Sequence, residues 1–283
     1  MMSERKFDRF ETLPCGSKIQ HGTYNDRIYL MHAAADGSGD LPERLIDIAN
    51  ERSYGKIFAK VPLSQADPFL KAGYRREAEV PDFYRGSETG LFLGYYLDKA
   101  RRKEADLDMY EHNKTLALNK KNAGIHPLDT SRFRLRSCSE EDLERMAEIY
   151  RVVFPSYPFP IHDTDYLRKT LRDNVDYFGI EAKGKLIALS SAEKYPEARH
   201  AEMTDFATLP DWRGNGLAVH LLMKMEEAMR RQNYATVFTI ARAASPGMNI
   251  TFAKCGYEYA GRLVNNTNIS GGMESMNVWY KSL

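Results

Sequence analysis

An arginine and two glycines stand together in the segment DFATLPDWRGNGLAVHLL, residues 205–222, where a β-prone run gives way to an amphipathic helix. Glycines at a helix start let backbone N–H groups, which have no partner inside the helix, approach an anion closely. Arg213 would add a positive charge beside Gly214 and Gly216. The segment lacks the Gly-Lys-Ser/Thr ending of a nucleotide P-loop and the third glycine of G-x-G-x-x-G. The turn therefore predicts a diphosphate site, although glycine would also suit an ordinary strand-to-helix turn.

The residues around this turn follow a known order. Arg213-x-x-Gly216-x-Ala218 fits the pattern Q/R-x-x-G-x-G/A, after an acidic strand and a proline and before a helix, a buried strand and a second helix ending in KCGY. This order resembles the acetyl-CoA-binding motif of the GCN5-related N-acetyltransferases (GNAT) and covers about the last 150 residues, a length typical of one domain. The resemblance implies that the strands around 204–209 and 236–242 splay apart beside the pantetheine arm. The residues it implies as acetyl-CoA contacts are Phe206, Ala207, Thr208, Arg213, Gly214, Asn215, Gly216, Leu217, Ala218, Ser245, Asn249 and Phe252.

Two carboxylates precede the turn and are the candidate catalytic residues, Glu202 and Asp205. An ε-ammonium with a pKa of about 10.4 must lose a proton before it can attack a thioester, and a carboxylate can attract the cation and accept that proton. In a regular strand the two side chains point to opposite faces, so both reach the site only if a bulge intervenes. We expect at least one of them to be a solvated or ion-paired surface carboxylate.

The residue that protonates the leaving thiolate is not assigned by the sequence. Many GNAT members have a tyrosine where this chain has Phe252, which cannot donate a proton. Tyr257, Ser245, Asn249 or water could replace it, or no protein acid is needed. Cys255 is expected to be a small buried residue rather than a nucleophile.

A closer resemblance spans both halves of the chain. The segments KIFAKVP, EAEVPDFYRG, TIARAASPGMNITFAKCGY and LVNNTNISGGMESMNVWYK are similar to those of the β-lysine N6-acetyltransferases. This implies transfer from acetyl-CoA to the ε-amine of L-β-lysine, which gives the compatible solute Nε-acetyl-β-lysine, without a metal. The alternatives are another small amine acceptor, such as a polyamine, lysine or an aminoglycoside, or a non-catalytic acyl-CoA-binding protein, which Phe252 favours. Candidate substrate contacts are Tyr157, Asp163, Arg242, Asn266 and Asn277.

The helices and strands expected around these residues indicate an α+β fold with a mixed sheet. The first half repeats part of the second: YGKIFAKV parallels YATVFTIA, FLKAGY parallels FAKCGY, and each pair is followed by two β-prone runs. We therefore expect a smaller degenerate GNAT-like domain over 1–97, a charged helical connector over 98–128 and a catalytic GNAT domain over 129–283. Where the second half has its glycine turn, the first offers only DGSGDLPERL, without the arginine, so we expect no cofactor there.

Composition excludes several classes of function. The net charge of +1 gives no basic field for nucleic acid or anionic membranes. Three scattered cysteines form neither a metal pattern nor a disulfide framework, and no apolar run approaches membrane-spanning length. A cytoplasmic enzyme of small-molecule amines is the expectation, with neither nucleic acid nor membrane as partner; a homodimer is compatible with it.

Overall fold

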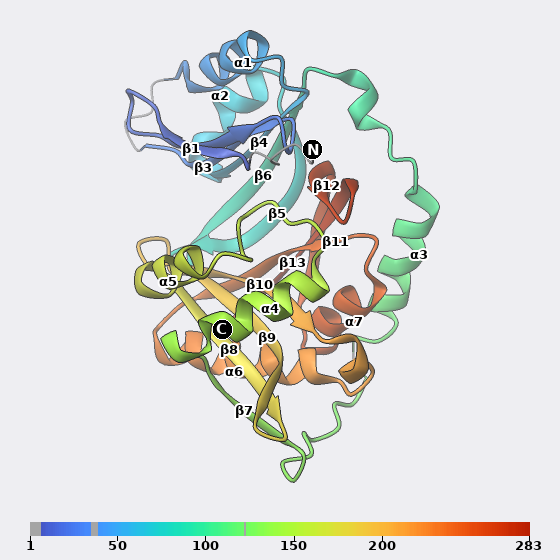
Figure 1. Ribbon diagram of the computed structural model, residues 1–283. Helices are drawn as coiled ribbons and strands as arrows, with labels where there is room; N and C mark the ends of the chain where they lie inside the picture. Colours follow the sequence, from blue (N-terminus) through green and yellow to red (C-terminus); the bar gives the residue numbers. More distant parts are fainter. Residues whose placement is uncertain (1–6, 35–38, 122) are drawn as a thin grey trace.

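A computed structural model describes residues 7–34, 39–121 and 123–283. Its strands form one mixed sheet in the order β1-β2-β3-β4-β6-β5-β12-β13-β11-β10-β9-β8-β7, and helices pack on both faces of it, so the fold is α+β as predicted. The two halves of the chain are seen one above the other in Figure 1. They join edge to edge where Gly261 of β12 pairs with Ala78 of β5. At this junction a Cβ on Gly261 would lie 2.1 Å from the Glu77 carbonyl oxygen, so only glycine fits.

The second half contains the elements that the sequence predicted. Ser139 and Asp142 form the expected capping box before the first helix, and Leu217, Leu221 and Met225 are buried along the core face of α6. The last hairpin turns at Ser270 and Gly271, both at positive φ. The elements are β7 (Phe133–Ser137), α4 (Leu143–Val153), α5 (Thr164–Asp173), β8 (Val175–Ala182), β9 (Lys185–Tyr195), β10 (His200–Thr208), α6 (Leu217–Arg231), β11 (Thr236–Arg242), α7 (Pro246–Lys254), β12 (Glu258–Ile269) and β13 (Gly272–Ser282).

The first half has the same topology on a smaller scale. Its elements are β1 (Arg9–Thr12), β2 (Lys18–Gly22), β3 (Arg27–His32), α1 (Leu41–Glu51), β4 (Lys56–Pro62), α2 (Ala66–Lys71), β5 (Arg75–Tyr84) and β6 (Glu88–Tyr96). The order β1-β2-β3-β4-β6-β5 mirrors β8-β9-β10-β11-β13-β12, with one helix between the parallel strands in each half. This shared order supports the duplication inferred from the sequence, whereas the domain boundaries stay a proposal. Of the segment DGSGDLPERL, residues 36–38 lie outside the described residues.

The connector packs against the second half and is more than a solvated link. It contains α3 (Leu107–Leu118), which runs along one side of the molecule beside α7 (Figure 1). Tyr110, Asn113 and Ala117 of α3 are buried, and the Asn113 amide donates to the Ala243 carbonyl over 3.0 Å. The connector therefore stabilises the edge of the domain that follows it.

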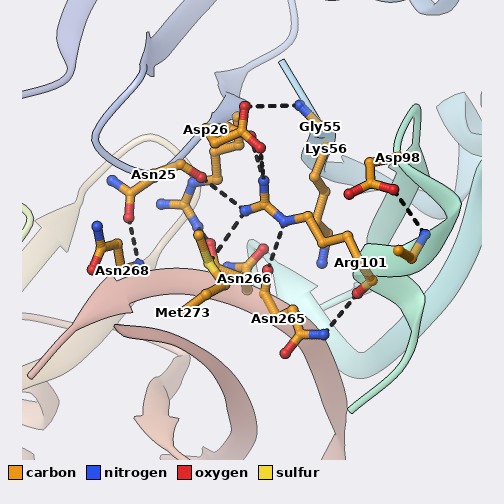
Figure 2. A network of polar contacts seen from close by, with 12 residues as sticks. Asn25, Asp26, Gly55, Lys56, Asp98, Arg101, Asn265, Asn266, Asn268 and Met273 are labelled. Carbon is orange, nitrogen blue, oxygen red and sulfur yellow. Dashed lines mark hydrogen bonds and ion pairs between the residues drawn. The ribbon is translucent and has the colours of Figure 1, made fainter. Parts of the chain in front are cut away.

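Arg101 in the connector ties the two halves together, as Figure 2 shows. Its guanidinium donates to the Asn25 carbonyl at 2.8 Å, to the Asp26 carboxylate at 2.9 Å and to the Asn265 carbonyl at 3.0 Å. Residues 25–26 belong to the β2–β3 turn of the first half, and Asn265 belongs to β12 of the second. This network holds the β2–β3 turn of the first half against β12 of the second.

Candidate active site

A cleft opens where two parallel strands of the second half separate. β10 and β11 pair only between His200–Glu202 and Thr236–Phe238, so the remainder of each strand diverges, as the GNAT resemblance implied. The cleft between them has a volume of about 610 Å³ and reaches the glycine turn, α7 and the loop after α4. The main-chain groups freed by the divergence are available to an extended ligand.

The glycine turn forms one end of this cleft. Gly214 and Gly216 both have positive φ (81° and 69°), a backbone conformation that favours glycine. α6 begins directly after Gly216, which offers no side-chain cap to the first N–H groups of the helix. Gly214, Gly216, Leu217 and Ala218 line the cleft with Arg213, whose Nε donates to the Thr208 carbonyl over 3.3 Å. The turn thus presents unpaired N–H groups, a helix N-terminus and a cation to the same space.

A bulge in β10 turns Asp205 toward the face that carries Glu202. The register with β9 shifts between Thr204 and Ala207, and Asp205 has φ of 54°. Its carboxylate accepts hydrogen bonds from the Tyr157 hydroxyl and from Ser191 Oγ, the latter at 2.6 Å. Ser191 pairs directly with Thr204, which shares a strand face with Glu202. The bulge that the sequence required for both carboxylates to share a site is therefore present.

The two carboxylates have different surroundings. Burial raises the pKa of Glu202 to about 7, although Lys60 and a hydrogen bond from the Ile240 backbone lower it. Burial also raises the pKa of Asp205, against the hydrogen bonds from Ser191 and Tyr157. Since hydroxyls hold both oxygens of Asp205, Glu202 is better placed to exchange a proton near neutral pH.

Most of the predicted acetyl-CoA contacts line the cleft, and three do not. Those that line it are Phe206, Thr208, Arg213, Gly214, Gly216, Leu217, Ala218, Ser245 and Phe252. Ala207 is packed in the core under α4, and the exposed Asn215 donates to the Trp212 carbonyl. Asn249 is fully buried and donates to the Arg242 and Ser245 carbonyls while accepting from Asn277 and Trp279. Its side chain braces the start of α7 and does not reach the cleft, so the structure gives no support to its predicted contact with acetyl-CoA.

The predicted substrate contacts are divided in a similar way. Tyr157 lines the cleft and donates to Asp205. Arg242 also lines it, but its guanidinium is held by Glu274 in a two-point ion pair (2.9 and 2.6 Å), so it is poorly placed for a second carboxylate. Asp163 is exposed and caps α5 through the Asp165 N–H, and Asn277 is fully buried against Asn249. These two side chains are engaged away from the cleft, so the structure gives no support to their predicted roles.

Asn266 lies in a buried cluster that the sequence did not reveal. Its side-chain Oδ1 is buried without a hydrogen-bond partner among the described residues. Lys60, from the first half of the chain, is buried close enough to Glu202 and Glu193 for their charges to influence its pKa. Ser191 and Glu193 were also missed, because one polar residue within a strand carries no signal of its own. Their alternation with Glu202 across the β9–β10 pair was the only available clue.

The candidates for the general acid are reduced by burial. Phe252 packs edge-on against Phe206 at the base of the cleft, with ring centroids 5.6 Å apart. Tyr257 is fully buried behind Phe252, and Asn249 is engaged in the network above. Of the side chains considered from the sequence, Ser245 is the one that lines the cleft.

Two kinds of feature are absent from the described residues. No group of three or more His, Cys, Asp or Glu side chains in that part of the chain is arranged to hold a metal ion. None of the described helices has the length and apolar character needed to cross a membrane.

Comparison with known proteins places the chain in a family. Residues 143–257 match the model of the acetyltransferase (GNAT) family. The chain is 40% identical over 270 residues to the β-lysine N6-acetyltransferase of Methanococcus maripaludis, covering 94% of this chain and 96% of that protein. It is 30% identical over 256 residues to the enzyme of the same name from Methanosarcina mazei (83% and 94% covered). It is also 31% identical over 265 residues to the N-acetyltransferase YodP of Bacillus subtilis (94% and 95% covered). The chain therefore belongs to the β-lysine N6-acetyltransferase family of GNAT acetyltransferases.

Proposed function

We propose that this protein transfers the acetyl group of acetyl-CoA to the ε-amine of L-β-lysine, giving Nε-acetyl-β-lysine and CoA. Two relatives that match along nearly their whole length are named for this reaction. The observation that carries the proposal is the half-buried acidic pair, Glu202 and Asp205, on one face of β10, with Asp205 lining the open cleft. An acidic site at that position suits a cationic amine that must be deprotonated before it reacts.

Glu202 is the proposed base. The ε-ammonium first gives one proton to Glu202, directly or through water, and the neutral amine nitrogen then forms a bond to the acyl carbon. The C–S bond breaks, CoA leaves as the thiolate, and the second proton that the nitrogen loses passes to that thiolate or to water. A carboxylate whose pKa is about 7 can accept that proton and release it again at neutral pH. Asp205 is the proposed anchor for the amine and for Tyr157, because its oxygens accept two hydroxyl hydrogen bonds.

The glycine turn is the proposed diphosphate site. The N–H groups at the start of α6 and the Arg213 guanidinium would face the diphosphate oxygens, and the freed edge of β10 around Phe206 and Thr208 would bind the pantetheine arm. A ligand held at both places would have its thioester near the Asp205 bulge.

Mass spectrometry of the product tests this function. The enzyme is incubated with acetyl-CoA and one amine at a time: β-lysine, α-lysine or 1,4-diaminobutane. Fragmentation of the product then locates the acetyl group. We expect a single acetyl group on the ε-nitrogen of β-lysine, with a higher kcat/KM than for the other two amines. Faster acetylation of 1,4-diaminobutane, or an acetyl group on the β-nitrogen, would contradict the proposal.

A further inference from the structure

Polar side chains gather on the inner face of the first half, where it meets the second. Gln20 of β2, Arg27 and Tyr29 of β3 and Lys60 of β4 share this face, since Tyr29 pairs directly with Gln20 and with Phe58, two residues before Lys60. All four are buried, with exposures of 1 to 7%. A sheet face packed inside a protein is expected to be apolar, so this concentration of polar groups requires an explanation.

Several of these groups have no partner in the described part of the chain. The Lys60 ammonium, both polar atoms of the Gln20 amide and Nε of Arg27 are buried without hydrogen bonds there, and so is Oδ1 of the adjacent Asn266. Arg27 Nη1 donates to the Asn266 carbonyl, which places β12 of the second half beside it. An unsatisfied buried polar group is destabilising, because it has given up its hydrogen bonds to water without replacing them. Such a set is expected where a ligand completes the hydrogen bonds.

Aromatic rings surround the Lys60 ammonium and leave it without a direct ion pair among the described residues. Its nitrogen lies 4.9 Å from the centre of the Tyr195 ring, 5.1 Å from Phe238 and 5.3 Å from Tyr29. Arg27 lies 5.5 Å from the centre of the same Tyr29 ring. Tyr29 therefore stands between two cations, both held inside the protein.

This cluster borders the proposed catalytic base. Glu202 accepts a hydrogen bond from the backbone of Ile240, which lines the cleft. Glu202 also pairs directly with Phe238, whose ring centre lies 5.1 Å from the Lys60 ammonium. Glu193 lies on the same side and accepts from the Tyr195 hydroxyl at 2.7 Å. A molecule whose amine is at Glu202 would extend its other end toward the two cations.

We propose that Lys60 and Arg27, both from the first half of the chain, bind the carboxylate of the amino-acid acceptor and select it against amines without one. This rests on the proposed function, because it assigns the end of the acceptor that does not react. Two buried cations would repel a polyamine at that end, whereas a carboxylate would supply the acceptor atoms that they lack. The Asn266 and Gln20 side-chain oxygens beside them suit the remaining ammonium of a zwitterion.

The test compares β-lysine with its carboxamide, 3,6-diaminohexanamide, which keeps the size and both amines but lacks the negative charge. Acetylation rates and calorimetric binding are measured for the native protein and for Lys60→Met, Arg27→Gln and the control Phe92→Leu. Phe92 packs on the same inner face, paired with Lys60 on the neighbouring strand, and carries no charge.

We expect the native protein to prefer β-lysine and each cation variant to lose roughly 10- to 100-fold of that preference, with little change in kcat/KM for the carboxamide. Phe92→Leu should keep the preference. Equal losses for both amines in the cation variants, or no preference in the native protein, would overturn the proposal. Binding of β-lysine that depends on Lys60 without any acetylation would support the site and contradict the proposed reaction instead. Thermal unfolding checks that each variant is folded.

Discussion

The two halves of this molecule have one topology and opposite uses of it. In the second half β10 and β11 pair over only three positions and then diverge into a cleft, whereas in the first half β3 and β4 pair over four positions, from Arg27 to Leu30, of a six-residue strand. In the second half a glycine turn with an arginine precedes the helix between the parallel strands. The same framework therefore gives an open ligand-binding edge in one copy and a mostly closed sheet in the other.

The first half would contribute to the proposed acceptor site through the face of its sheet rather than through an open strand edge. In the first half Tyr29 pairs with Phe58, and at the equivalent place in the second half Glu202 pairs with Phe238. Tyr29 therefore occupies the position that corresponds to the proposed base. Phe58 and Phe238 belong to one apolar cluster between the halves. The first half thus presents a packed sheet face beside the acidic strand of the second half, whose own cleft opens at a strand edge.

The largest expected effect concerns the proposed base, Glu202, whose counterpart in the first half is Tyr29. Glu202→Gln should lower kcat by about 10²–10⁴-fold, because the amide cannot accept the amine proton. In the native enzyme kcat/KM should fall as pH falls through about 7, where Glu202 becomes protonated, and the variant should lack this inflection. Steady-state kinetics over pH 5–9, with Glu193→Gln as the matched half-buried carboxylate, measure both. An equal loss in the two variants would place the base elsewhere.

The next effect concerns the glycine turn, the feature for which the first half shows no counterpart in its described residues. Arg213→Ala should raise KM for acetyl-CoA roughly 10- to 100-fold, because a charged hydrogen-bond donor to the diphosphate is lost. KM for β-lysine should hardly change. Arg231→Ala is the control, since Arg231 is exposed at the other end of α6 and pairs with Glu227. Comparable changes in both KM values would argue against diphosphate binding at this turn.

A third variant, Asn249→Ala, distinguishes a structural role of this residue at the start of α7 from a role in binding acetyl-CoA. Asn249→Ala should reduce the free energy of unfolding by about 1–3 kcal/mol, because buried partners lose their hydrogen bonds, and leave KM for acetyl-CoA near its native value. Chemical denaturation and kinetics measure the two quantities, with the exposed Asn215→Ala for comparison. A large rise in KM without loss of stability would restore Asn249 as a contact.

The smallest expected effect concerns the electrostatic interaction between Lys60 of the first half and Glu202 of the second. Glu202 faces Lys60 of β4, Glu193 of β9 and Asp205 of its own strand, with Arg27 and Tyr29 of β3 beyond them. The positive charge of Lys60 lowers the pKa of Glu202, so Lys60→Met should move the acidic limb of the kcat/KM profile upward by less than about one pH unit. The carboxamide is the substrate for this measurement, so that carboxylate binding does not contribute. A downward movement would show that Lys60 does not act on Glu202.

The sequence by itself determined the fold class, the repeat and the glycine turn, because each depends on local order. Hydrophobic spacing marks strands and helices, and positive φ at Gly214 and Gly216 is a requirement of neighbouring residues. The need for a bulge before both carboxylates could act also followed from strand alternation alone.

Only the tertiary structure decided which polar side chains meet. The sequence predicts Asn249 as a contact of acetyl-CoA and Asn277 as a contact of the substrate, but their amides form a hydrogen bond with each other inside the core. Lys60 and Glu202 are far apart in the chain and belong to different halves, so no spacing could connect them. Packing the inner face of one half on the other brought them together. Burial then gave them shifted pKa values, because the energy of a charge depends on the groups and the solvent around it rather than on its neighbours in sequence.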